Sequence, residues 1–212
     1  MRRALQLVCL GGLLCVAPQL WAQCVTTNGT WQRTAFPEGA ETGTFETTFT
    51  GEPMASAPTN DDDVLIAVGT VDAFNDGAAI IGFHDNGEVE ARNGGAYAND
   101  VTVTYTAGDL FEFRVVLDVV AETYDVFVSK NGAAEQQLAN DYAFRTDWTG
   151  SGSLDGWVVH DEAGSAEFCS FAITEEGGGG PTPQVPSGIV QASGPLQSPG
   201  PVQSPGPLQV PR

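Results

Sequence analysis

The sequence predicts an all-β protein, a two-sheet antiparallel β-sandwich of the jelly-roll type. The segment 110–128 indicates this most clearly, because apolar and polar residues alternate there with a period of two on both sides of a break at Ala121–Glu122. Such alternation is typical of antiparallel strands with one buried and one solvent-facing side. The pattern recurs at the spacing of short strands, and almost nothing in the chain favours a helix.

Other segments show strand patterns and are expected to complete the two sheets. Their ranges, in chain order, are 44–49, 64–71, 80–83, 89–92, 101–105, 157–160 and 167–173. Phe45 and Phe49 are expected to point inward, and the apolar run 64–71 fits a central strand. The Asp-Asn-Gly sequence at 85–87 predicts a hairpin turn. Residues 133–143 have the weakest pattern, and a short helix is an alternative there.

Residues 1–22 are predicted to be a secretory signal peptide. Arg2 and Arg3 precede a short apolar run at 5–16, and Ala22 offers a small residue at the cleavage point. The run is too short to span a membrane, and no other apolar segment approaches bilayer length. We therefore expect a protein that is secreted to the extracellular space or the periplasm, without membrane insertion.

Export leaves two cysteines, Cys24 and Cys169, near the two ends of the expected domain. In an oxidising compartment they are expected to form one disulfide bond. A metal-binding or redox pair is the alternative, but the sequence has no C-x-x-C spacing and no nearby histidine to favour it.

Residues 23–174 are expected to form the sandwich, and residues 175–212 a disordered tail. From Gly177 to Pro211 the chain has no charged or aromatic residue, and its end repeats the pattern SGPLQ, SPGPVQ, SPGPLQ. Such a composition buries too little apolar area to offset the entropy lost on ordering. The tail is expected to be a spacer, with a ligand for a proline-recognition domain as the alternative; the sequence identifies no protein partner for it.

The exported chain is strongly acidic. Six basic residues remain beside 27 acidic ones once the signal is removed, which gives a net charge of −21. A field of this sign repels nucleic acid and anionic membranes, so neither is expected as a partner. Solubility outside the cell explains the charge, and cation binding is the alternative.

Calcium is the one cofactor for which the sequence offers candidate ligands. Asp61 and Asp63 lie before the predicted strand 64–71, and Asp72 and Asp76 lie after it. Both segments are rich in the oxygen ligands that calcium prefers. Neither has the spacing of an EF-hand loop, and turn formation and solvation are the alternative explanation.

Two pairs of carboxylates have a two-residue spacing, which places both side chains on one strand face, as in the catalytic pairs of retaining glycosidases. Asp61 and Asp63 form one such pair, and Glu88 and Glu90 form another. Neither pair occurs in the E-x-D-x-x-E arrangement of sandwich-fold glucanases, so we expect exposed carboxylates on a strand face.

Histidine chemistry is not expected either. His84 and His160 are the only histidines, and each is predicted to be a surface or turn residue. A nucleophilic triad needs a base that a third group holds in place, and two scattered histidines do not supply one. The sequence therefore predicts a protein without enzymatic activity.

Sugar binding requires aromatic faces for stacking and planar polar groups for hydroxyls. The segment 90–97, E-A-R-N-G-G-A-Y, is the best candidate, because it places Arg92, Asn93 and Tyr97 at the mouth of a hairpin. Arg145 and Trp148 are further candidate ligand-binding residues. The alternative is a structural role, with tryptophans in the core and arginines paired to the acidic surface.

The chain resembles the concanavalin A-like lectin/glucanase superfamily of laminin-G-like jelly rolls, and more narrowly the uncharacterised secreted bacterial modules of that class. The motifs are G-T-W-Q at 29–32, T-G-T-F at 42–45, R-N-G-G-x-Y at 92–97, F-x-F-R-V-V-L-D-V-x-A-x-T-Y-x-V-F-V from 111, Y-A-F-R-T at 142–146 and S-L-D-G-W at 153–157. The resemblance covers the whole domain and implies a binding role. The glucanase carboxylates and the metal-ligand run of the lectins are not visible.

These observations favour a secreted, non-catalytic module that binds a carbohydrate or glycan. A structural or adhesive extracellular protein with a proline-rich spacer is the alternative. A divergent polysaccharide hydrolase or lyase is a third, less favoured hypothesis.

Overall fold

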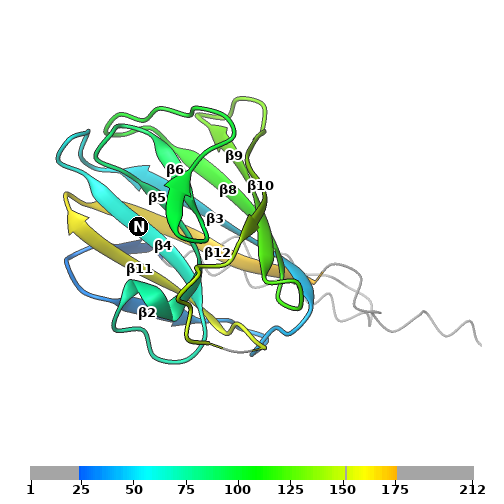
Figure 1. Cartoon of the computed structure of the whole chain (residues 1–212). Helices are drawn as coiled ribbons and strands as arrows, with labels where there is room; N and C mark the ends of the chain where they lie inside the picture. The colour runs from blue at the N-terminus through cyan, green and yellow to red at the C-terminus, as the bar shows by residue number, and fades with distance from the viewer. Residues whose placement is uncertain (1–23, 151, 176–212) are drawn as a thin grey trace, which may run out of the picture. The chain divides into compact units, whose positions relative to one another are not determined.

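The computed structural model describes residues 24–150 and 152–175, in which twelve β-strands form two antiparallel sheets of six strands each (Figure 1). The described residues contain one short 3-10 helix, η1 (Phe74–Asp76), and no α-helix. No helix in these ranges is long and apolar enough to cross a bilayer. The predicted β-sandwich is therefore confirmed. Glu175, the first residue of the predicted tail, ends strand β12, while the predicted signal peptide and the rest of the tail lie outside the described residues.

The first sheet contains the hairpin that the alternation at 110–128 predicts. Its strands, in spatial order, are β1 (Cys24–Thr26), β12 (Ala166–Glu175), β3 (Thr44–Pro53), β8 (Phe111–Asp118), β9 (Thr123–Lys130) and β10 (Gln136–Ala143). In the β8–β9 ladder Val115 pairs with Val126 and Leu117 with Tyr124, and all four side chains are buried. Residues 133–143 contribute strand β10 to this sheet, so the helix considered there does not form.

The second sheet carries most of the candidate site residues that the sequence indicates. Its strands, in spatial order, are β2 (Gln32–Ala35), β11 (Gly156–Ala163), β4 (Asp61–Ala67), β5 (Gly77–Phe83), β6 (Val89–Asn93) and β7 (Ala96–Ala98). The central strand starts and ends earlier than the apolar run 64–71, because Asp61 to Asp63 already pair with β5 and β11, and Gly69 leaves the extended conformation at a φ of 69°. Asp61, Asp62 and Asp63, which the sequence analysis placed before this strand, are therefore its first three residues.

The prediction of a strand at 101–105 is wrong in part. Val103 and Tyr105 are buried as the alternation requires, but the segment forms only an isolated bridge between Thr104 and Glu88. Its backbone runs alongside the β5–β6 turn, and the Tyr105 N–H donates to the carbonyl oxygen of Gly87 in that turn at 3.1 Å. Alternation reports which side chains are buried, and it does not report which backbone groups pair.

Two links tie the layers and the chain ends together. The indole N–H of Trp157 in the second sheet donates to the Thr47 hydroxyl in the first at 2.8 Å, and both residues are buried in the core between the sheets. The predicted disulfide between Cys24 and Cys169 is confirmed, and it joins the paired strands β1 and β12. This bond agrees with an oxidising compartment, whereas export itself remains a prediction.

Candidate functional site

A cleft opens on the outer face of the second sheet. Side chains alternate along β4, so Val64 and Ile66 enter the core between the sheets, while Leu65 and Ala67 belong to a smaller apolar cluster on the outer face. Asp61 and Asp63 share that outer register. The cleft has a volume of about 230 Å³ and is lined by Asp61, Asp63, Phe74, Arg92, Tyr97, Arg145 and Glu162. It thus collects residues from β4, β6, β7, β11, the helix η1 and the loop that follows β10.

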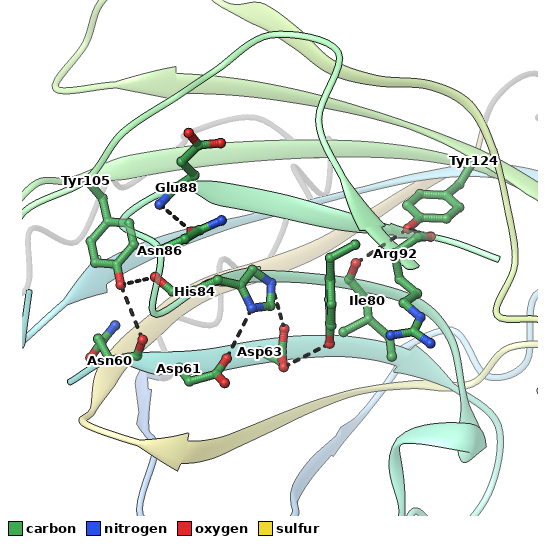
Figure 2. A network of polar contacts seen from close by, with 11 residues as sticks. Asn60, Asp61, Asp63, Ile80, His84, Asn86, Glu88, Arg92, Tyr105 and Tyr124 are labelled. Atoms are coloured by element: carbon green, nitrogen blue, oxygen red, sulfur yellow. Dashed lines mark hydrogen bonds and ion pairs between the residues drawn. The ribbon is translucent and has the colours of Figure 1, made fainter. Parts of the chain in front are cut away.

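A polar network forms the floor of this cleft (Figure 2). His84, which directly follows β5, places Nδ1 3.1 Å from Asp61 Oδ1 and Nε2 3.7 Å from Asp63 Oδ1. The Tyr97 hydroxyl donates to Asp63 Oδ2 at 3.3 Å, and its ring lies 4.1 Å from the His84 ring between centroids. Three strands therefore hold one acid–imidazole–acid array in a fixed arrangement.

Burial sets the protonation of this network. Asp63 is only 3% exposed, and this burial raises its pKa to about 6, against the opposing effect of the His84 charge. Burial alone would lower the pKa of His84, but its hydrogen bond to Asp61 and the negative charges of Asp63 and Asp61 outweigh burial and raise that pKa. Burial and the charge of Asp63 raise the pKa of Tyr97 far above its usual value, so its hydroxyl stays a neutral donor. The floor of the cleft can therefore hold or release a proton near neutral pH.

The predicted exposure of Asp63 and His84 is wrong. His84 is only 6% exposed, and its backbone oxygen accepts a hydrogen bond of 2.6 Å from the buried Tyr105 hydroxyl. Asp63 is covered because Gly82 lies opposite it in the β4–β5 ladder and leaves room for the carboxylate. One feature of the sequence does indicate this burial. Asp63 lies two residues before the buried Leu65, so both side chains point to the same face of the strand.

Two arginine side chains, Arg92 and Arg145, also line the cleft. The two glycines of the β6–β7 hairpin hold Arg92, whose Nε donates to Gly94 O at 3.2 Å and Nη2 to Gly95 O at 2.7 Å. Tyr124 reaches across the core from the first sheet and donates to the Arg92 carbonyl oxygen at 2.5 Å (Figure 2). The Arg92 guanidinium carbon lies 5.0 Å from the centre of the Tyr97 ring. Hydrogen bonds thus hold both the backbone and the side chain of Arg92 in place.

Three of the five predicted ligand-binding residues meet at this cleft, namely Arg92, Tyr97 and Arg145. Arg145 is oriented by Asp147, to which its Nε donates at 2.6 Å. Asn93 does not line the cleft, and its side-chain oxygen accepts a hydrogen bond of 3.2 Å from the Ala143 N–H. Trp148 is half-buried and packs edge-on against Phe144, with the two ring centres 5.4 Å apart. Both of these side chains support the fold around the cleft.

The four predicted calcium ligands form two separate groups. Asp61 and Asp63 belong to the cleft, whereas the Asp76 carboxylate accepts hydrogen bonds of 3.0 Å from the N–H groups of Asp72 and Ala73. Among the described residues, the acidic, histidine and cysteine side chains come within mutual ligand distance in a single group of three, which contains the disulfide and Glu167. Calcium binding stays a prediction.

The second predicted carboxylate pair lies apart from the cleft. Glu88 precedes β6 and accepts a hydrogen bond of 2.8 Å from the Asn99 side chain. Neither Glu88 nor Glu90 lines the cleft. Of the two pairs that the two-residue spacing indicates, only Asp61 and Asp63 take part in the site.

Several solved structures align with about 70% of this chain at low sequence identity. No family model and no curated protein matches the chain. The catalytic domain of the glycoside hydrolase family 131 protein from Coprinopsis cinerea aligns over 72% of this chain and 69% of its own, with 18% identity and a TM-score of 0.48. Lectin I-B4 from Griffonia simplicifolia, in its metal-free form, aligns over 74% and 86%, with 12% identity and a TM-score of 0.47. The SPRY domain of human HERC1 aligns over 70% and 88%, with 17% identity and a TM-score of 0.40.

These three proteins are of different kinds, namely a catalytic domain, a lectin and a SPRY domain. One fold commonly hosts unrelated functions, so a functional conclusion has to come from the residues of the site.

Proposed function

We propose that the protein is a glycan-binding module and that a neutral saccharide docks in the cleft on the second sheet. The observation that carries this proposal is the convergence of aromatic surfaces with fixed planar polar groups. Phe74 and Tyr97 offer apolar faces, and Arg92, Arg145 and Asp61 offer donors and acceptors around the same cleft. Small-molecule sites combine apolar walls with a few oriented polar groups in this way.

The charge of the site favours a neutral ligand over a polyanion. Asp61, Asp63 and Glu162 line the cleft, and the exported chain is expected to carry a net charge of −21. The two arginines are already engaged, Arg145 with the Asp147 carboxylate and Arg92 with backbone carbonyls. An anionic polysaccharide would meet a field of its own sign on approach.

The proposal is tested by measuring the binding of the full chain to cellulose, β-1,3-glucan, xylan and mannan, with alginate and polygalacturonate as anionic comparisons, each with and without calcium. We expect binding to at least one neutral polysaccharide, and we expect Arg92→Ala and Tyr97→Ala to weaken it at least tenfold. Absence of binding to every polysaccharide would refute the proposal.

A matched control for these variants exists on the other sheet. Arg114 and Phe127 also form an arginine–aromatic pair, with the guanidinium carbon 3.8 Å from the ring centre. They lie on the outer face of β8 and β9, away from the cleft. Arg114→Ala and Phe127→Ala should leave the affinity unchanged, and an equal loss in both pairs would contradict a site at the cleft.

A second candidate function, cleavage of the bound glycan, is favoured by one observation. Asp63 combines a pKa of about 6 with a place on the cleft floor beside His84, and a carboxyl group whose pKa is raised toward neutral pH is suited to general acid catalysis. Release of new reducing ends from the same polysaccharides tests this function. Activity that Asp63→Asn abolishes would support it, whereas binding without turnover would leave the module non-catalytic.

A further inference from the structure

A second hollow lies on the same face of the second sheet, toward its β2 edge. It has a volume of about 600 Å³ and is lined by Trp31, Arg33, Asp72 and Asp155 together with the loop 69–71. None of these residues lines the cleft described above. The hollow is therefore a separate depression and not an extension of the cleft.

An aromatic ridge separates the hollow from the cleft and also connects them. The Trp31 ring stacks on His160 with the centroids 3.9 Å apart, and Phe74 packs edge-on against Trp31 at 5.0 Å and against His160 at 5.4 Å. Phe74 lines the cleft and Trp31 lines the hollow, so the two depressions share one apolar divide. A chain-like ligand that leaves the cleft across Phe74 arrives at Trp31.

The polar side chains of the hollow are fixed in the protein itself. Arg33 Nη2 lies 2.5 Å from Asp155 Oδ1, and the same oxygen accepts a hydrogen bond of 2.9 Å from the Gly69 N–H. Gly156 leaves space for the guanidinium, because a Cβ there would stand 3.0 Å from the Arg33 guanidinium carbon. The Arg33 and Asp155 side chains remain 31% and 29% exposed. They are therefore oriented before any ligand arrives, which lowers the entropic cost of binding.

We infer that this hollow is a second saccharide subsite, in which one sugar unit of a neutral glycan stacks on Trp31 and bonds to the Arg33–Asp155 pair. The inference rests on the proposed function, since the same glycan occupies the cleft with another unit. An aromatic ring beside a fixed, partly exposed pair of planar polar groups matches a sugar, which has an apolar face and a rim of hydroxyls. The protein then recognises a chain of several units and binds a single sugar weakly.

The test is a chain-length series measured by titration calorimetry. The probes are β-1,3-gluco-, cello-, xylo- and manno-oligosaccharides of one to six units, added to the full chain. The parent protein should gain affinity with length until both depressions are filled. Trp31→Ala and Arg33→Gln should lose about tenfold in affinity for the long oligosaccharides and almost nothing for the short ones, whereas Tyr97→Ala should weaken binding at every length.

Failure of the subsite is distinguishable from failure of the proposed function. If Trp31→Ala and Arg33→Gln keep the chain-length dependence of the parent, the second subsite is refuted and binding at the cleft stands. If no oligosaccharide and no polysaccharide binds the parent, both proposals are refuted. Phe127→Ala controls for the loss of an outward-facing aromatic ring, and Arg33→Gln, at a partly exposed position, gives the same readout should Trp31→Ala fail to fold.

Discussion

Gly82 lies directly opposite Asp63 in the β4–β5 ladder, and the Asp63 carboxylate occupies the space that a side chain at position 82 would fill. A Cβ at this position would also collide with the backbone oxygen of Asp62, at 2.5 Å. The glycine thus explains how a buried acid fits into a ladder whose neighbouring residues are tightly packed. It supports the cleft without lining it.

Gly82→Ala should therefore both destabilise the fold and disturb the cleft. Overpacking of a close contact usually costs about 1–3 kcal/mol in the free energy of unfolding, which urea denaturation measures. The same variant should weaken glycan binding, because Asp63 has to move away from Tyr97 and His84. Gly43→Ala is the matched control, since a Cβ at Gly43 meets nothing within 4 Å. Equal effects at the two positions would contradict this role for Gly82.

Asp62 should make the fold less stable as the pH rises. It points away from the cleft, it is fully buried, and burial raises its pKa from the usual 3.8 to about 7, although the Thr27 hydroxyl donates to it at 2.6 Å. The folded state then holds the proton more tightly than the unfolded state. The free energy of unfolding should fall between pH 4 and pH 7, by at most about 4 kcal/mol.

The variant Asp62→Asn removes this dependence. Urea denaturation should find it as stable as the parent at pH 4 and clearly more stable at pH 8. Asp85→Asn, which removes a negative charge at an exposed position, should give no such difference between the two pH values. A parent protein that gains stability between pH 4 and pH 7, with Asp62→Asn gaining equally, would show that Asp62 has no part in the effect.

The hydroxyl of Tyr97 should hold the pKa of Asp63 below the value that burial alone would impose. Tyr97→Phe keeps the ring and removes the donor to Asp63 Oδ2, so the pKa of Asp63 should rise above its present value of about 6. The pH dependence of the Asp63 carboxyl carbon signal in NMR measures this change. Tyr142→Phe is the control, because that hydroxyl donates to Asp100 at 3.1 Å and not to Asp63. An unchanged titration in Tyr97→Phe would refute the expected coupling.

Loss of the disulfide should destabilise the whole sandwich. Cys24 and Cys169 are separated by 145 residues. Closing so long a loop reduces the entropy of the unfolded chain and, in the chain-entropy model, stabilises the fold by up to about 5 kcal/mol. The double variant Cys24→Ser/Cys169→Ser should therefore unfold at a much lower urea concentration than the oxidised parent. Reduction of the parent should reproduce the effect. Two free thiols per denatured, non-reduced chain would contradict the bond.

The sequence was sufficient for the features that depend on local pattern. Alternation at 110–128 predicted the β8–β9 hairpin because burial on one face imposes a period of two on each strand. The pairing of Cys24 with Cys169 followed from there being no other cysteine after the signal peptide. Of the candidate binding residues, Arg92 and Tyr97 were close in sequence and pair across the β6–β7 hairpin.

The floor of the cleft could not be predicted in this way. Asp63, His84 and Tyr97 come from the regions of three different strands, and the burial of Asp63 depends on Gly82, a residue whose contribution is the absence of a side chain. The Trp31–Phe74–His160 ridge likewise joins residues far apart in the chain. Only the sheet order brings such residues together, and the sequence alone does not state that order.

Strand β4 places the residues of the cleft and the residues of the core on opposite faces, so the binding surface and the packing of the fold do not compete for the same positions. Its outward residues Asp61 and Asp63 belong to the cleft, whereas Val64 and Ile66, with the opposite register, belong to the core. Substitutions that change the ligand can therefore accumulate on one side of the strand while the packing on the other side is preserved. The same scaffold is in this sense suited to diversification, by selection or by design, toward different ligands.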